Sequence, residues 1–184
     1  APVALRAGRY ATSHNVLPVE DFPAMVAGDL PHRCRIPAGT LRGLIDRTKF
    51  AISNEETRYY LNGIYLHVTE SGAIPMLRAV ATDGHRLARV ETELPEGARG
   101  MPGVIIPRKT VAELRKLLDE GAAALAVSLS DTRIQFQAGP VLLTSKLIDG
   151  TFPASERVIP QGNDRLLRLP KKDFAASVGR VAAI

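Results

Sequence analysis

The stretch Ile36-Pro37-Ala38-Gly39-Thr40-Leu41 returns twice in variant form along this chain, as Ile106-Pro107-Arg108-Lys109-Thr110-Val111 and as Leu169-Pro170-Lys171-Lys172-Asp173-Phe174. In each copy an apolar residue precedes a proline, whose fixed φ favours the first turn of a helix. One such helix start is common, but three indicate an internal repeat. The connector Leu17-Pro18-Val19-Glu20-Asp21-Phe22-Pro23 also returns, as Leu147-Ile148-Asp149-Gly150-Thr151-Phe152-Pro153.

Helical periodicity follows the first two helix starts. Residues 40–52 place Leu41, Leu44, Ile45 and Ile52 on one helical face, and residues 108–119 carry the apolar stripe Val111, Leu114, Leu117 and Leu118. Strand-like runs are expected at 59–68, 76–82, 85–90, 104–106, 125–129, 133–137 and 141–147. Because three strands follow each helix, the pattern predicts an α+β fold of repeated strand–helix–three-strand units with antiparallel sheets. It argues against a doubly wound nucleotide-binding sheet.

The phase of the repeat predicts three parts. We expect residues 1–24 to be the tail of a preceding domain with its linker, and residues 25–152 to be a complete middle domain. Residues 153–184 are expected to be a linker and the first helix of a third domain. The chain does not begin with methionine, and its last helix ends on the apolar stretch Val181-Ala182-Ala183-Ile184 without strands to cover it. We therefore expect a fragment of a longer protein.

The composition is that of an ordinary globular protein. The chain has 184 residues, of which 45% are hydrophobic and 23% charged, enough apolar surface to form a core. No apolar run approaches the roughly 18 residues that a membrane span needs. The single cysteine, Cys34, excludes an internal disulfide and fits a reducing, cytoplasmic compartment. The net charge of +5 is compatible with a polyanionic partner but does not require one.

No motif of catalysis or metal binding stands out. The sequence lacks a glycine-rich phosphate loop, a Gly-x-Ser-x-Gly elbow and a His-Glu-x-x-His pair. His32 and Cys34 lack the second pair of ligands that a zinc site needs, and Asp83 and His85 lack a third catalytic partner. We therefore expect no enzyme activity, metal or cofactor. Asp83-Gly84 is more simply interpreted as a hairpin turn, because both residue types tolerate positive φ.

Around this turn, Ala81-Thr82-Asp83-Gly84-His85-Arg86-Leu87-Ala88 resembles the signature of the bacterial DNA polymerase III β subunit family, the sliding clamps. Three further blocks resemble the same family in its order and spacing: Arg58-Tyr59-Tyr60-Leu61-Asn62-Gly63, Ile105-Ile106-Pro107-Arg108-Lys109 and the stretch from Thr144 to Pro153. The resemblance covers essentially the whole chain. It implies a DNA clamp fold with two helices on the inner face and antiparallel sheets outside, in a head-to-tail homodimeric ring of three similar domains per subunit.

Such a ring encircles double-stranded DNA without reading its sequence and tethers polymerases and repair proteins, so the implied role is processivity in DNA replication. The ring performs no chemistry, and labels such as DNA-directed DNA polymerase or nucleotidyltransferase belong to the holoenzyme. The resemblance also implies a clamp loader as partner and no membrane association. One domain of this length has a radius of gyration of about 16 Å, so several are needed to enclose a duplex.

The resemblance implies a DNA-binding set: Arg58, Tyr59, Tyr60, Arg108, Lys109 and Arg157. Tyrosines can stack on unpaired bases, although alternation along a strand would turn one of this pair into the core. Where family members often carry a polar uncharged residue, this chain has Glu55 and Glu56. A diffuse positive field would come from the two helices, through Arg42, Arg47, Lys49, Arg108, Lys109, Arg115 and Lys116, offset by Asp46, Glu113 and Asp119. The alternative is that these residues form ordinary solvated helix faces.

The resemblance implies a second site, a hydrophobic cleft between the middle and third domains for an extended motif, roughly Gln-Leu-x-Leu-Phe. The matching positions are Leu61, Thr82, Gly84, His85, Arg86, Leu87, Pro153 and Val158. Leu61, Leu87, Pro153 and Val158 would form an apolar socket, and Gly84 would allow close backbone approach. The alternative is that the leucines are ordinary core residues. A peptide-binding interaction module without a role at DNA is the other function that fits.

Overall fold

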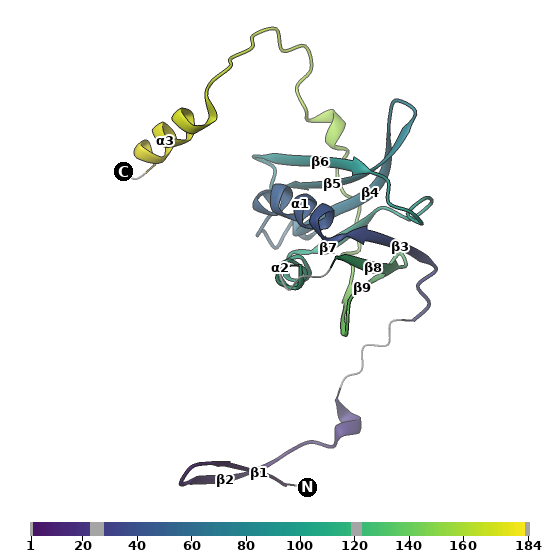
Figure 1. The fold of residues 1–184 in the computed structure, drawn as a ribbon, viewed down its shortest axis with the longest axis vertical. Coiled ribbons are helices and arrows are strands. Elements are labelled where there is room, and N and C mark those ends of the chain that lie inside the picture. Colours follow the sequence, from purple (N-terminus) through teal and green to yellow (C-terminus); the bar gives the residue numbers. More distant parts are fainter. Residues whose placement is uncertain (1, 23–27, 119–122, 183–184) are drawn as a thin grey trace. The chain divides into compact units, whose positions relative to one another are not determined.

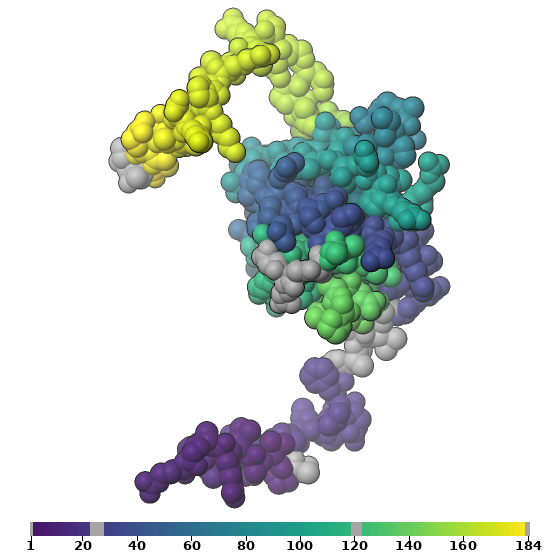
Figure 2. All heavy atoms as spheres, in the orientation of Figure 1, coloured from purple at the N-terminus to yellow at the C-terminus, as the bar shows by residue number. Residues whose placement is uncertain are grey.

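The computed structural model describes residues 2–22, 28–118 and 123–182 of the chain. Two compact units, Ala1–Phe152 and Pro153–Ile184, divide the chain between them (Figure 1). In Figure 2 the blue-to-green residues of the first unit, which include its two long helices, form one continuous body. Among the described residues no helix is both long enough and apolar enough to cross a membrane.

Two four-stranded antiparallel sheets make up most of the first unit. The first sheet has the order β6-β5-β4-β7 and consists of β4 (Gly63–Ser71), β5 (Ile74–Thr82), β6 (Leu87–Glu93) and β7 (Val104–Pro107). The second has the order β10-β9-β8-β3 and consists of β3 (His32–Pro37), β8 (Ala124–Leu129), β9 (Arg133–Ala138) and β10 (Val141–Lys146). The predicted α+β class with antiparallel sheets is confirmed.

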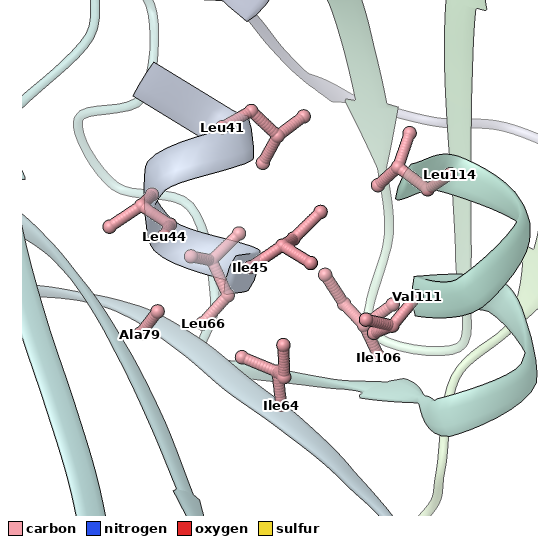
Figure 3. A pocket seen from close by; sticks show the side chains of 9 residues that line it. All are labelled: Leu41, Leu44, Ile45, Ile64, Leu66, Ala79, Ile106, Val111 and Leu114. Carbon is pink, nitrogen blue, oxygen red and sulfur yellow. The ribbon is translucent and has the colours of Figure 1, made fainter. Parts of the chain in front are cut away.

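Both long helices of this unit begin directly after a strand, at the predicted prolines. Pro37 is the N-cap of α1 (Ala38–Thr48), and Pro107 is the N-cap of α2 (Arg108–Leu117). The proline ring sets φ near the value needed at a helix start, so each strand turns into its helix without a connecting loop. The predicted apolar faces are confirmed: the buried helical residues include Leu41, Leu44, Ile45, Val111 and Leu114. They face one another above the first sheet (Figure 3).

The first helix is shorter at its C-terminal end than predicted. At Thr48 the side-chain Oγ1 donates a 2.7 Å hydrogen bond to the carbonyl oxygen of Leu44, and the chain continues as a 3₁₀ turn, η2 (Lys49–Ala51). Ile52 therefore lies beyond the helix, although it is buried in the same core. Its periodic position predicted the burial correctly and the helical conformation wrongly.

The first strand of each repeat unit belongs to the sheet of the other unit. β3 precedes α1 in the chain but pairs with β8, while β7 precedes α2 but pairs with β4. Each sheet thus combines three consecutive strands of one sequence repeat with the first strand of the other repeat. Because of this exchange, the two sequence repeats share one hydrophobic core within the first compact unit. This core contains residues of both helices and both four-stranded sheets.

Two strands begin later than predicted. The run expected from Tyr59 begins instead as a 3₁₀ turn, η3 (Tyr59–Leu61), and the strand starts at Gly63. The run expected from His85 starts at Leu87, because residues 83–86 form the turn between β5 and β6. In both places the first residues of the alternating stretch form a turn held by local hydrogen bonds, and the strand begins after that turn.

The remaining described elements are small. Near the N-terminus, β1 (Pro2–Ala7) and β2 (Tyr10–Asn15) pair as a hairpin, and η1 (Val19–Asp21) follows. The second unit contains η4 (Ser155–Arg157) and α3 (Lys171–Val181), which begins after Pro170 as the third repeat copy predicted. All residues of α3 are solvent-exposed in this unit. Ala183 and Ile184, which the sequence placed at the end of this helix, lie outside the described residues.

Candidate functional site

The sheet β6-β5-β4-β7 carries apolar side chains on both of its faces. On one face Ile64 and Leu66 belong to the main core beneath the helices (Figure 3). On the other face, strand register places Tyr65 of β4 directly between Val80 of β5 and Ile105 of β7. The outward face of an antiparallel sheet is usually polar, so this second apolar row marks a candidate site.

We call this second group the outer cluster. It comprises the buried residues Leu61, Val80, Ile105 and Phe152, with Tyr60, Tyr65, Leu87 and Ile148 packed against them. The segment after β10 covers part of it: the Ile148 amide donates a 3.0 Å hydrogen bond to the Ile105 carbonyl, and the Phe152 ring stacks on Tyr65 with centroids 5.0 Å apart. Leu61 is 3% exposed, whereas Leu87 is only partly buried, so Leu87 forms the accessible edge.

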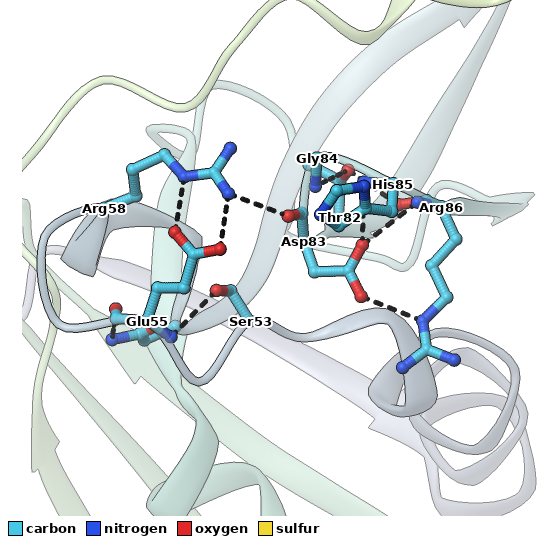
Figure 4. A network of polar contacts seen from close by, with 9 residues as sticks. Ser53, Glu55, Arg58, Thr82, Asp83, Gly84, His85 and Arg86 are labelled. Atoms are coloured by element: carbon cyan, nitrogen blue, oxygen red, sulfur yellow. Dashed lines mark hydrogen bonds and ion pairs between the residues drawn. The ribbon is translucent and has the colours of Figure 1, made fainter.

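The turn between β5 and β6 borders this edge and is held by Asp83. Its Oδ1 accepts hydrogen bonds from the backbone amides of His85 and Arg86, both 3.0 Å long, and its Oδ2 accepts one of 2.9 Å from Nε of Arg86 (Figure 4). The Arg86 and His85 amide bonds are the largest causes that lower the pKa of Asp83 to about 2. The carboxylate is therefore a turn-forming group that binds the His85 backbone.

A second polar group joins this turn to the loop before η3. Nε and Nη2 of Arg58 donate to the two carboxylate oxygens of Glu55, at 2.9 and 2.7 Å, and Nη2 also donates to the carbonyl oxygen of Asp83 at 3.2 Å (Figure 4). The Ser53 hydroxyl accepts a bond from the Glu55 amide. The hydrogen bond from Arg58 lowers the pKa of Glu55. The loop and the turn are thus tied through one guanidinium.

The structure brings the first-unit residues of the expected peptide site together. Thr82 and Leu87 are a cross-strand pair, and the Thr82 hydroxyl donates a 2.7 Å bond to the Arg86 carbonyl. Gly84, His85 and Arg86 are exposed at the turn, and Arg86 lies over Phe50, 5.9 Å from its ring centre. Pro153 and Val158 belong to the second unit, where both are exposed.

The residues of the outer cluster that sequence reasoning missed are Val80, Ile105, Phe152, Tyr65 and Ile148. Alternation gave a usable signal for Val80, since Val80 and the predicted site residue Thr82 must share one face of β5. The partners from β7 and from the connector carried no such signal, because their approach depends on the exchanged strand. The exposed Phe50 beneath Arg86 was also missed.

The expected DNA-binding residues are more dispersed. Tyr59 is exposed while Tyr60 packs on the outer cluster, and their rings meet edge to face with centroids 5.9 Å apart. Both tyrosines lie on a 3₁₀ turn, so strand alternation does not decide their directions. At the start of α2, Arg108 and Lys109 are exposed, and Nη1 of Arg108 donates to Oδ1 of Asn54. Arg157 is exposed at the end of η4 in the second unit.

Several helix cations are already engaged within the protein. Asp46 of α1 accepts a 2.8 Å hydrogen bond from Nε of Arg115 on α2 and pairs with Nζ of Lys49 at 2.8 Å, and the Arg115 bond is the largest cause that lowers its pKa. Nη2 of Arg42 donates to the Leu118 carbonyl at 2.5 Å.

On α2, Lys116 pairs with Glu113 at 2.8 Å. Arg47, like Arg108 and Lys109, is exposed. Asp119, a further expected counter-charge, lies outside the described residues. The positive field expected from the helices is thus partly neutralised by Asp46 and Glu113.

Two other candidate positions are ordinary core features. The space between the helices in Figure 3 has a volume of about 10 Å³ and a wholly apolar lining, which is at the lower limit for one water molecule. Cys34 is buried, and burial raises the pKa of its thiol to about 11, so it is held as a neutral thiol. Within the described part of the chain, no three His, Cys, Asp or Glu side chains are grouped as metal ligands would be.

Comparison with known proteins gives a consistent result. The family model of the DNA polymerase III beta subunit, central domain, matches residues 35–154. The beta sliding clamp of Caulobacter vibrioides is 49% identical over 182 residues, which are 99% of this chain and 49% of that protein. The Escherichia coli beta sliding clamp is 40% identical over 177 residues, 93% of this chain and 46% of that protein. The chain spans about half the length of the curated relatives it matches.

Solved structures show the same likeness. A Caulobacter crescentus beta sliding clamp superposes with a TM-score of 0.93 at 49% identity, covering 100% of this chain and 49% of that one. A sliding clamp from Bartonella birtlesii, solved with griselimycin bound, superposes with a TM-score of 0.89 at 50% identity, covering 97% of this chain and 48% of that one. The similarity therefore extends over both described units.

Proposed function

Because this chain belongs to the DNA polymerase III beta subunit family, we propose that it forms part of a sliding clamp that encircles duplex DNA and tethers polymerases to it. In this proposal residues 25–152 are the complete middle domain, residues 1–24 end a preceding domain, and residues 153–184 begin a third. The ring is a head-to-tail homodimer of full-length subunits, opened by a clamp loader in the cytoplasm, and it performs no chemistry of its own.

The observation that carries the proposal is the outer cluster, an apolar group on the sheet face opposite the helices. Leu87 leaves the edge of this apolar group partly open to solvent beside an exposed turn, where an apolar side chain of a partner can be buried. An extended peptide of the type Gln-Leu-x-Leu-Phe would place its apolar anchor against Leu61 and Leu87 and run along the backbone at Gly84. Pro153 and Val158 would complete the socket.

The helices support the DNA part of the proposal. A clamp that slides must attract phosphates weakly and without base contacts. Exposed cations whose positive charge is partly neutralised by neighbouring carboxylates are suitable for this. Arg47, Arg108 and Lys109 are exposed on α1 and α2, and Asp46 and Glu113 limit the total field. Tyr59, Tyr60 and Arg157 are proposed as further DNA contacts by their family positions.

The test is a chimera in which this chain replaces the matching segment of the Caulobacter vibrioides beta sliding clamp. After incubation with that organism's clamp loader, we expect the chimera to co-elute with closed circular DNA and to be released when the circle is linearised. The parent clamp is the positive control. Retention that survives linearisation would contradict encirclement.

The peptide arm uses the chain as it stands. A fluorescent Gln-Leu-x-Leu-Phe peptide should bind saturably, as measured by anisotropy, while a peptide with the Leu and Phe anchors replaced by alanine should not. Peptide binding without retention of the chimera on circular DNA would favour the interaction module that has no role at DNA. Failure of both arms would overturn the proposed function.

A further inference from the structure

We propose that Arg58 is a positioning residue for the Asp83–Arg86 turn, with Glu55 orienting its guanidinium so that the turn and the backbone at Gly84 keep one conformation. The inference rests on the proposed peptide-binding function, because the turn borders the outer cluster. It moves Arg58 from a phosphate contact to a structural support of the peptide site. The contacts of the guanidinium carry the argument.

Arg58 makes its contacts with the fork of its guanidinium. Nε and Nη2 face the two oxygens of Glu55 in a bidentate pair, and the same Nη2 reaches the carbonyl of Asp83. An exposed ion pair between flexible side chains usually contributes little, and these side chains are 37% and 48% exposed. The bidentate geometry is the exception, because it fixes the plane of the guanidinium. A fixed plane is what allows Nη2 to support a second element.

The turn is shaped to receive this guanidinium. Gly84 has φ +89°, and a Cβ atom built there would lie 2.5 Å from Nη1 of Arg58. The guanidinium therefore lies against the bare Cα of Gly84. Within the turn, the Asp83 side chain holds the His85 and Arg86 amides. The backbone of residues 83–86 is thus held by Asp83 from within the turn and by Arg58 from the neighbouring loop.

The same contacts reduce the ability of Arg58 to bind phosphate. The negative charge of Glu55 cancels the local field of the guanidinium, and a phosphate would have to compete with a bidentate carboxylate. The mutual hydrogen bonds raise the pKa of Arg58 and lower that of Glu55, as expected for a pair that stays charged. Removal of Glu55 would release Arg58 from the turn toward solvent.

The experiment measures amide hydrogen exchange at His85 and Arg86 in the 184-residue chain and in three variants. Arg58→Ala removes the support and Glu55→Gln weakens its orientation. Glu113→Gln is the matched control for Glu55→Gln, because it changes the net charge equally and breaks another exposed i,i+3 pair, that with Lys116 on α2. We expect exchange of both amides to rise about threefold to tenfold in Arg58→Ala, less in Glu55→Gln, and to stay unchanged in Glu113→Gln.

Peptide affinity is measured on the same variants, with the thermal midpoint recorded for each. Arg58→Ala should weaken binding of the Gln-Leu-x-Leu-Phe peptide about threefold to tenfold, and Arg58→Lys should not restore it, because a lysine ammonium lacks the planar fork that pairs bidentately with Glu55 and fixes the donor toward the Asp83 carbonyl. Unchanged exchange in Arg58→Ala would overturn the inference, as would faster exchange with full peptide affinity. If the unaltered chain bound no peptide, the peptide-binding part of the proposed function would fail, while the exchange data would still decide whether Arg58 holds the turn.

Discussion

The guanidinium of Arg58 occupies the space that a side chain at Gly84 would fill, with Nη1 2.5 Å from the ideal Cβ position. Glycine is therefore required there for two independent reasons. The backbone has φ +89°, in the region that residues with a Cβ rarely adopt, and the neighbouring loop already uses the free volume. Two segments separated by more than twenty residues thus constrain the same position.

Gly84→Ala should lower the free energy of unfolding by about 1–2 kcal/mol from backbone strain alone, with a further loss from displacing Arg58. In the Arg58→Ala background the second loss should vanish, because the space is then empty. Urea unfolding of the single and double variants measures the interaction between the two substitutions, which we expect to be a coupling free energy of about 0.5 kcal/mol or more. Strictly additive effects would show that the guanidinium moves aside freely.

Leu87→Asp should abolish binding of the Gln-Leu-x-Leu-Phe peptide while leaving the fold intact. Leu87 is only partly buried at the edge of the outer cluster, so an aspartate can remain solvated while it removes the apolar anchor and adds a charge. The matched control is Leu142→Asp on β10, where the leucine is 57% exposed. If both variants lost peptide affinity equally, as measured by anisotropy, the peptide would not bind at the edge formed by Leu87.

Asp46→Asn should strengthen the binding of short duplex DNA to the chain. Asp46 pairs with Lys49 and Arg115, and its neutralisation removes a negative charge from beside both cations, so the positive field that phosphates meet at this surface increases. The slope of log affinity against log salt concentration should steepen by about one to two, since each phosphate contact releases roughly one counterion.

Glu70→Gln is the control for Asp46→Asn, because it changes the net charge equally at an exposed residue of β4. If both variants gained affinity to the same extent, net charge alone would explain the change. A gain specific to Asp46→Asn, measured by anisotropy across a salt series, supports DNA contact by the two helices.

The turn at Asp83 should be insensitive to pH across the neutral range and should open in acid. Its pKa is lowered in the folded state to about 2 from a usual value near 3.8. A lowered carboxyl pKa means that the stabilising charge is fully present above the unfolded-state value and is lost as the pH falls through the folded-state value. Exchange protection at His85 and Arg86 should therefore decline between about pH 4 and pH 2.

Asp83→Asn is the control for this titration, because an amide does not ionise. The variant should show weaker protection of the two amides at neutral pH and no further decline over the acid range. A midpoint near the ordinary aspartate value in the unaltered chain would contradict the proposed role of the carboxylate in the turn.

The sequence by itself determined the elements and their inward faces. Pro37, Pro107 and Pro170 stand before α1, α2 and α3 as predicted, because proline acts through local backbone geometry. Leu41, Leu44, Val111 and Leu114 are buried as their spacing required, since a helix of fixed period can turn only one face to the core. The repeat predicted the order of helices and strands, and therefore the α+β class.

Only the tertiary structure decided which strands meet and which groups pair. The exchange of β3 and β7 between the repeat units places Ile105 beside Tyr65, and no local pattern along the chain records that choice. The same holds for Asp46 with Arg115 and for Arg58 with the turn at Gly84. Strand exchange and side-chain pairing depend on the approach of segments far apart in sequence, whereas periodicity and proline geometry act within a few residues.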